Sequence, residues 1–369
     1  MMGQFPFTTT EMNHKFIIIL IVLLGLILWT TWRFWRILPF PGWGKWLFVV
    51  LYLLAFLVIF PHFIYGNRMP LALATATYEI GTSWMIFFLY ALIIFTILSI
   101  GRLLHIVPAT LLKDSWAGTI TVFSALVLLL TCGYFNYHHK YRESIEIETE
   151  KPLDKPLTIV LASDLHAGYH NRKAELSRWV ELFNAENPDL VLFAGDIIDG
   201  SVRPVKECGY AEVFRKINAP VYSCLGNHEY ISGKDGAEDF FREAGIRLLK
   251  DSVATECGIR IIGRDDRSNP RRSSLGALAG SDSLFTILLD HQPFNLEEAQ
   301  EAGIDFQFSG HTHHGQVWPG NWITDAMYEK AFGEYRRGST RYYVSSGLGI
   351  WGGKFRIGTR SEYLVLSIR

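Results

Sequence analysis

Four long apolar runs precede residue 141, and they limit the possible folds more than any other feature. Each is long enough to cross the hydrocarbon core of a membrane, which takes roughly 20 residues of α-helix. The runs cover residues 16–35, 46–65, 84–104 and 116–135. Trp and Tyr border many of them, as is typical where aromatic rings lie at the level of the lipid headgroups. We therefore predict a membrane module with four transmembrane helices in residues 1–140.

Two other interpretations of these runs are weaker. Buried helices of a large soluble core would not explain four such runs in succession, separated by short polar loops. A signal peptide would not explain the first run, because it is longer than the usual apolar segment and no small-x-small cleavage site follows it. We interpret the first run as a retained span.

The Lys and Arg residues near the spans indicate an orientation. The first and third loops carry five of them, whereas the N-terminal segment and the middle loop carry two. This bias places those two loops in the cytoplasm. Lys140 and Arg142, which follow the last span, reduce the difference to five against four. Because four spans leave both chain ends on one side, we predict a multi-pass protein of the cell membrane with an extracytoplasmic soluble domain.

The chain beyond the spans has the composition of a folded domain. Residues 141–156 are charged and contain Pro152 and Pro156, which predicts a linker, and residues 157–369 form the soluble domain. A net charge of −1 argues against a nucleic-acid partner. Cys208, Cys224 and Cys257 lack the spacing of a metal site, so we interpret them as isolated thiols.

Strand and helix patterns alternate in the first half of this domain. Apolar strands are predicted at residues 157–162, 189–194 and 219–225. Between the first two, Leu176, Trp179, Val180 and Phe183 form one apolar stripe of a helix. The second half is richer in strands, at residues 259–263, 284–289, 305–309, 342–345 and 363–368. The pattern predicts an α/β domain.

Polar residues follow five of these strands. They are Asp164 and His166, Asp196, Asn227, His291, and His311 and His313. Each has an ordinary explanation as a helix cap, a turn residue or a buried histidine. Together they are the oxygen and imidazole ligands that suit Mn, Fe or Zn. Seven candidates are too many for one tetrahedral ion and enough for two ions that share a carboxylate.

The same residues resemble a known family. Asp-x-His, Gly-Asp-x-x-Asp, Gly-Asn-His-Glu, a lone His and Gly-His-Thr-His occur here in the order found in the calcineurin-like metallophosphoesterases. The four spans make the chain similar to the transmembrane proteins with a metallophosphoesterase domain. The resemblance implies a four-layer sandwich, in which two mixed β-sheets pack face to face with helices outside.

The resemblance also implies roles for the motif residues. One divalent metal ion would be held by Asp164, His166, Asp196 and His313, and the other by Asp196, Asn227, His291 and His311. His228 would contact the phosphoryl oxygen and help the leaving group depart, with Asp199 in support. His314 stands where close relatives usually have Gly, which leaves a contact with substrate open. The identity of the metals, Mn, Zn or Fe, stays open as well.

The implied function is hydrolysis of phosphate mono- or diesters, including phosphodiesterase activity, by attack of a water that bridges the two metal ions. One alternative is a lipid-linked pyrophosphate hydrolase acting on a substrate such as UDP-diacylglucosamine, because aromatic and basic residues at 317–341 could line a pocket beside the membrane. That substrate would require a cytoplasmic site, whereas an extracytoplasmic domain would suit phosphoesters of the cell envelope. An alternative of another class is a catalytically silent membrane sensor or scaffold.

Overall fold

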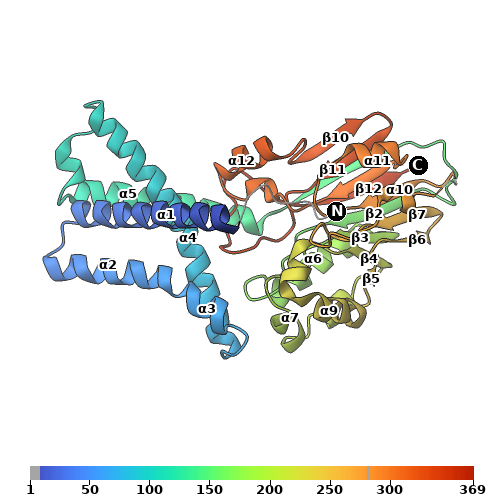
Figure 1. The fold of residues 1–369 in the computed structure, drawn as a ribbon, viewed down its shortest axis with the longest axis horizontal. Coiled ribbons are helices and arrows are strands. Elements are labelled where there is room, and N and C mark those ends of the chain that lie inside the picture. Colours follow the sequence, from blue (N-terminus) through green and yellow to red (C-terminus); the bar gives the residue numbers. More distant parts are fainter. Residues whose placement is uncertain (1–8, 281–282) are drawn as a thin grey trace. The chain divides into compact units, whose positions relative to one another are not determined.

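The computed structural model describes residues 9–280 and 283–369. Its chain forms two compact units (Figure 1). Of the described residues, the first unit contains 9–64 and 80–131, and the second contains 65–79, 132–280 and 283–369. Three helices therefore begin or end in a different unit from the one that holds most of their length.

The first unit is helical and apolar. Its helices come from α1 (Thr9–Ile37), α2 (Gly42–Leu57), α3 (Ile59–Tyr65), α4 (Leu71–Leu103), the 3₁₀ turn η1 (Ala109–Leu112) and α5 (Trp116–His138). The buried ring of Phe34 packs against Phe48, Tyr52, Phe95 and Phe123 and joins the helices. Many other apolar side chains are exposed, as expected for helices that face lipid.

Within residues 9–280 and 283–369, four segments are long and apolar enough to cross a membrane: Ile17–Ile37, Gly42–Tyr65, Leu71–Leu103 and Trp116–His138. They match the four predicted spans, except that the third begins at Leu71 and not at residue 84. Thr75, Thr77 and Glu79 lower the hydropathy of its first turns. Those turns belong to the second unit, where polar side chains find partners, and this explains why an apolar pattern failed to include them.

The second unit contains two mixed six-stranded sheets. The first has the strand order β1-β12-β2-β3-β4-β5 and the second the order β10-β11-β9-β8-β7-β6. Their bounds are β1 Lys140–Ile147, β2 Leu157–Ala162, β3 Leu190–Ala194, β4 Val221–Cys224, β5 Arg247–Leu248, β6 Ser252–Glu256, β7 Ile259–Gly263, β8 Thr286–Leu289, β9 Phe306–Ser309, β10 Gly333–Arg337, β11 Thr340–Val344 and β12 Ser361–Ile368.

Side chains that alternate along each strand pack into different layers, either between the two sheets or against the outer helices. In β2, Ile159 and Leu161 lie in the core between the two sheets, whereas Val160 and Ala162 face the helices outside the first sheet. In the second sheet, Leu288 faces the outer helices. The helices of this unit are α6 (Lys173–Ala185), α7 (Arg203–Glu207), α8 (Ala211–Phe214), α9 (Asn227–Ala244), α10 (Leu275–Leu278), α11 (Glu297–Glu301), η2 (His313–Gly315) and α12 (Gly320–Met327). The predicted four-layer sandwich is confirmed (Figure 1).

Two segments differ from their predictions. Residues 140–147, most of which we expected in a linker, form β1, which pairs with β12 in parallel. Ile145 and Ile147 are buried while Glu146 is exposed, and the four charged residues of this segment hid the alternation. The loop expected at 317–341 contains α12, which has mostly exposed side chains, and β10, in which exposed and half-buried side chains alternate.

Candidate metal centre

The ends of five strands bring the candidate ligands together. In the first sheet β2, β3 and β4 are parallel neighbours, so the residues after them meet at one edge: Asp164 and His166, Asp196, and Asn227. In the second sheet β8 and β9 are also parallel, and they are followed by His291 and by His311 and His313. Because the sheets stack face to face, the two edges supply one site.

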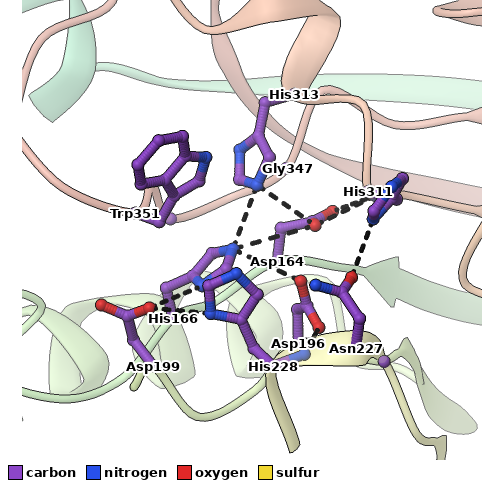
Figure 2. Close-up of polar contacts among 12 residues, drawn as sticks. Asp164, His166, Asp196, Asp199, Asn227, His228, His311, His313, Gly347 and Trp351 are labelled. Atoms are coloured by element: carbon purple, nitrogen blue, oxygen red, sulfur yellow. Dashed lines mark hydrogen bonds and ion pairs between the residues drawn. The ribbon is translucent and has the colours of Figure 1, made fainter. Parts of the chain in front are cut away.

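One cluster, here the first ligand group, consists of Asp164, His166 and His313. The Nε2 atoms of His166 and His313 lie 3.0 Å apart. Asp164 Oδ1 lies 3.3 Å from His313 Nε2 and 3.9 Å from His166 Nε2 (Figure 2). Three donor atoms therefore converge on one point in the buried interior, as donors around a metal ion do.

The second ligand group consists of Asn227, His291 and His311. Asn227 Oδ1 lies 3.2 Å from His291 Nε2 and 2.8 Å from His311 Nδ1. The rings of His291 and His311 stand nearly perpendicular, with their centroids 5.1 Å apart. These atoms again point toward a common centre.

Asp196 lies between the two groups. Its Oδ2 is 3.7 Å from His166 Nε2 in the first group and 3.2 Å from His291 Nε2 in the second. Its Oδ1 accepts a hydrogen bond from the backbone N–H of His228 at 2.8 Å. All seven predicted ligands are thus gathered in one place, with one carboxylate common to both groups.

The backbone of this site is strained. Asp164, His166, Asp196, His311 and His313 all have positive φ, between 46° and 70°. Only a few per cent of non-glycine residues adopt such values, and they concentrate where the surrounding structure holds a functional side chain in place. Five of the seven candidate ligands have positive φ. This concentration of strained residues at the strand ends is typical of a functional site.

Two motif positions require glycine, because a candidate ligand carboxylate lies too close to each for a Cβ atom to fit. A Cβ on Gly226 would lie 2.2 Å from Asp196 Oδ1, and a Cβ on Gly310 would lie 2.2 Å from Asp164 Oδ2. Either contact would displace a carboxylate. This accounts for the glycine that opens Gly-Asn-His-Glu and the one that opens Gly-His-Thr-His.

Neighbouring groups orient the ligands. Nδ1 of His291 lies 2.7 Å from the carbonyl oxygen of Ala194, which assigns the proton to Nδ1 and leaves Nε2 free to bind a metal. The backbone N–H of His311 donates to both oxygens of Asp164 at 3.0 and 3.1 Å. The buried Arg356 donates to the carbonyl oxygen of His313 at 2.8 Å.

Glu229 joins two of the strand ends. Its buried carboxylate accepts from the backbone N–H groups of Gly226, Asp196, Ile197 and Ile198, at 2.7 to 3.0 Å. Sequence reasoning assigned neither Glu229 nor Arg356. Glu229 stands inside the Gly-Asn-His-Glu motif, three residues after the residue that precedes α9, and this capping-box spacing was a usable signal. Arg356 has no comparable signal.

The pKa shifts of three ligands, Asp196, His311 and His313, favour metal binding. Burial raises the pKa of Asp196, but the nearby His291 and His228 rings outweigh it and hold that pKa well below its usual range. Burial lowers the pKa of His311 to about 4, and burial together with His166 holds the pKa of His313 well below its usual range. An ionised Asp196 and neutral His311 and His313 are forms that bind a metal. Burial lowers the pKa of His291, but Asp196 outweighs burial and raises that pKa well above its usual range, so His291 must release a proton before it can bind a metal.

His228 and Asp199 form a pair beside the ligands. His228 Nδ1 lies 2.9 Å from Asp199 Oδ1, and His166 Nδ1 lies 3.4 Å from the same oxygen (Figure 2). Burial lowers the pKa of His228, but the charges of Asp196 and Asp199 prevail and raise it to about 9. The two carboxylates therefore favour the protonated form of this ring, which lies at the edge of the candidate metal centre.

His314 turns toward α12. Its ring stacks on Phe332 with centroids 4.6 Å apart, and its Nε2 lies 3.6 Å from Asp325 Oδ1. His314 therefore contacts two residues of the segment that follows the candidate ligands, Asp325 and Phe332.

Comparison with known proteins agrees with this geometry. Residues 157–315 match the family model described as calcineurin-like phosphoesterase. An uncharacterized metallophosphoesterase of Aquifex aeolicus is 30% identical over 258 residues, which cover 66% of this chain and 97% of the relative. The chain belongs to the calcineurin-like metallophosphoesterase family.

Other metallophosphoesterases of the family are longer than the matched region. A Helicobacter pylori relative, also an uncharacterized metallophosphoesterase, is 33% identical over 58% of this chain and 60% of its own length. A zebrafish protein named transmembrane protein with metallophosphoesterase domain is 30% identical over 64% of this chain and 60% of its own length. This chain thus matches about three fifths of these two relatives.

The residues present fit the metal ions of a metallophosphoesterase. Two imidazole nitrogens that face each other at 3.0 Å, with carboxylate oxygens within 4 Å, need a cation or a shared proton between them. Nitrogen and carboxylate oxygen donors suit Zn, Fe or Mn. The site contains such donors on both sides of Asp196.

Proposed function

We propose that this protein is a membrane-anchored phosphoesterase that uses two divalent metal ions, Mn, Zn or Fe, to hydrolyse phosphate mono- or diesters. The observation that carries the proposal is the position of Asp196, with one oxygen within 3.7 Å of a histidine from each ligand group. A carboxylate common to two sets of donors is the arrangement that a pair of ions requires. Membrane association follows from the four apolar helices.

The protein's own residues would complete the chemistry. Two divalent ions, when bound, would activate a water as nucleophile and neutralise charge on the phosphoryl oxygens. His228 lies beside the candidate ligands, so it can stabilise the developing charge and, when protonated, give a proton to the departing oxygen. Asp199 orients His228 through Nδ1, which leaves Nε2 for the substrate. The convergence of all seven donors supports a hydrolase over a catalytically silent sensor or scaffold.

A specific observation favours a second candidate, hydrolysis of a lipid-linked pyrophosphate. The side chains of Trp322, Ile323 and Met327 on α12 are each more than 60% exposed. Asp325 of the same helix contacts His314, the neighbour of the candidate ligand His313. An exposed apolar face next to the site suits the hydrocarbon part of an amphiphilic phosphoester, such as UDP-diacylglucosamine.

The division of the chain into a membrane module at 1–140 and a metallophosphoesterase domain at 157–369 is part of this proposal, as is an extracytoplasmic active site. An extracytoplasmic site would act on phosphoesters of the cell envelope, whereas a lipid nucleotide would require a cytoplasmic one. A tag at Arg369 in intact cells distinguishes the two. Labelling by a membrane-impermeant reagent supports the extracytoplasmic placement, and labelling only after lysis contradicts it.

The experiment for the reaction uses the full-length protein in detergent, stripped of metal and reloaded with Mn, Zn or Fe. Aryl phosphate monoesters, aryl diesters and a lipid-linked pyrophosphate are compared as substrates. We expect metal-dependent hydrolysis that His228→Ala lowers by about 10²- to 10⁴-fold. His139→Ala, at an exposed histidine, is the matched control. Activity that survives metal removal, or that His228→Ala leaves intact, would contradict the proposal.

A further inference from the structure

The first turns of the third candidate span are built into the same unit as the metal centre. Residues 65–79 include the start of α4 and belong to the unit that contains both sheets. Arg203 donates to the carbonyl oxygens of Gly66 and Met69 at 3.0 and 2.7 Å. Ser201 donates to Asn67 at 2.8 Å. Hydrogen bonds therefore hold residues 66–69 against the residues that follow Asp199.

Tyr78 extends this contact to Asp199 itself. Its hydroxyl donates to Asp199 Oδ2 at 2.6 Å and accepts from the backbone N–H of Gly352 at 3.1 Å. Its ring lies 5.2 Å from the ring of His170. Tyr78 and Asp199 are both buried, so the hydrogen bond is shielded from water.

The two carboxylate oxygens of Asp199 therefore contact different residues. Oδ1 lies 2.9 Å from His228 Nδ1 and 3.4 Å from His166 Nδ1. Oδ2 accepts from Tyr78 at 2.6 Å and lies at the longer distance of 3.7 Å from His170 Nδ1. A carboxylate bound through one oxygen alone can rotate about its last torsion, because that torsion has a broad energy minimum. A strong donor on the second oxygen fixes the plane of the carboxylate. The direction of Oδ1 toward His228 is then fixed as well.

We propose that Tyr78 is a positioning residue for His228, acting through Asp199. A residue of a candidate membrane span thus sets the orientation of the group that assists the leaving oxygen. The inference rests on the proposed function, because it assigns Tyr78 a part in the same reaction. It makes the start of α4 a component of the active site in addition to an anchor.

The test compares Tyr78→Phe with Tyr169→Phe in the full-length, metal-loaded protein. Tyr169 is a suitable control because its hydroxyl lies 3.4 Å from Asn67 in the same contact region and its ring lies 6.0 Å from that of Tyr78. Each substitution removes one hydroxyl and keeps the ring. The measurements are kcat, KM, metal content and the ratio of rates for p-nitrophenyl phosphate and phenyl phosphate.

We expect Tyr78→Phe to lower kcat by about 10- to 100-fold with little change in KM, as is typical when a supporting hydrogen bond is lost. The loss should be larger for phenyl phosphate, because its poorer leaving group needs more assistance from His228. Metal content should stay at the wild-type level, and Tyr169→Phe should stay within about twofold of wild type. Unchanged kcat and leaving-group ratio in Tyr78→Phe would overturn the inference.

A double-mutant cycle separates this role from general packing. If Tyr78 acts through Asp199, Tyr78→Phe should cause no further loss in an Asp199→Asn background. Multiplicative losses would overturn the inference even if both variants are less stable. Loss of activity in His228→Ala without loss in Tyr78→Phe would reject the role of Tyr78 and leave the proposed function standing. An inactive wild type, or an active His228→Ala, would reject the proposed function.

Discussion

The two ligand groups are held by different parts of the chain. In the first group, His166 contacts Asp199, which Tyr78 of α4 binds, and His313 is held by Arg356. In the second group, His291 is oriented by Ala194 at the end of β3, and Asn227 lies in the first turn of α9. The first group thus depends on helices that continue into the candidate spans, whereas the second depends on the sheets and α9.

The last turns of α5 strengthen this contrast. Asn136 donates to the carbonyl oxygens of Arg356 and Thr359 at 2.9 and 2.8 Å, and Arg356 donates its N–H to the carbonyl oxygen of Gly133. The Arg356 guanidinium then reaches His313, as well as the carbonyl oxygens of Ser346 and Gly349. Contacts from α4 and α5 therefore hold the first ligand group, contacts from the sheets and α9 hold the second, and Asp196 lies between the two groups. Four substitutions test whether the two groups can be weakened separately.

Asp196→Asn should have the largest effect, because it removes the carboxylate common to both groups. We expect loss of both metal ions and a fall in kcat of at least about 10³-fold, since several kcal/mol of metal-ion stabilisation are lost and each 1.36 kcal/mol is tenfold. Elemental analysis and an aryl phosphate assay measure both. Asp235→Asn, at a side chain that is 96% exposed, is the control. Retention of two ions would show that Asp196 is not shared.

His313→Ala should separate the first group from the second. It removes a donor that is 3.0 Å from His166 and leaves the contacts of His291 and His311 with Asn227 unchanged. We expect about one of two ions to be lost and kcat to fall by about 10²- to 10³-fold, comparable with loss of a major electrostatic group. Loss of both ions together would mean that the two groups bind metal as one unit. The measurement is metal stoichiometry by titration.

Asp199→Asn should have a smaller effect, of about 10- to 100-fold in kcat. The Asp199 charge helps to raise the pKa of His228 to about 9, so its removal lowers that pKa. Activity that requires protonated His228 is lost as pH rises through this pKa. The alkaline limb of the kcat profile should therefore move to lower pH by about one unit. An unshifted limb would show that His228 is not the proton donor.

Asn136→Ala should have the smallest effect. It removes the two hydrogen bonds that Asn136 donates at the end of α5, each worth about 1 kcal/mol, and a longer one of 3.4 Å that it accepts from the Tyr141 hydroxyl. We expect metal affinity at the first group to fall by up to about tenfold and the second group to be unchanged. Asn184→Ala, which removes a hydrogen bond to the carbonyl oxygen of Lys216 and one from the N–H of Asn218, is the control. An equal fall in metal affinity at both ligand groups would contradict the idea that α5 supports only the first group.

The strand ends could be predicted from sequence because apolar runs and the polar residues after them are local signals. Helix α9 also had a local signal that was missed. Ala237, Phe240, Phe241 and Ala244 are buried at helical spacing, but Gly233, which has a φ of 96°, interrupts the pattern before them.

The supports of the site could not be predicted in the same way. Tyr78 and Asp199 are 121 residues apart, and Asn136 and Arg356 are 220 apart. Apolar periodicity identifies which face of an element is buried, but it does not identify the partner. Tyr78 is also preceded by a mildly polar stretch, so hydropathy placed it outside the third span.

The position of Tyr78 limits how such a protein can be processed. Many membrane-bound hydrolases can be shed by proteolysis of the connection between anchor and catalytic part. Here a cut at residues 148–156 would separate the fold from one of its own strands, β1, and from the hydroxyl that holds Asp199. A fragment released in this way would carry all seven candidate ligands but lack the hydroxyl that we propose orients His228, so we expect release to lower activity by at least about 10-fold.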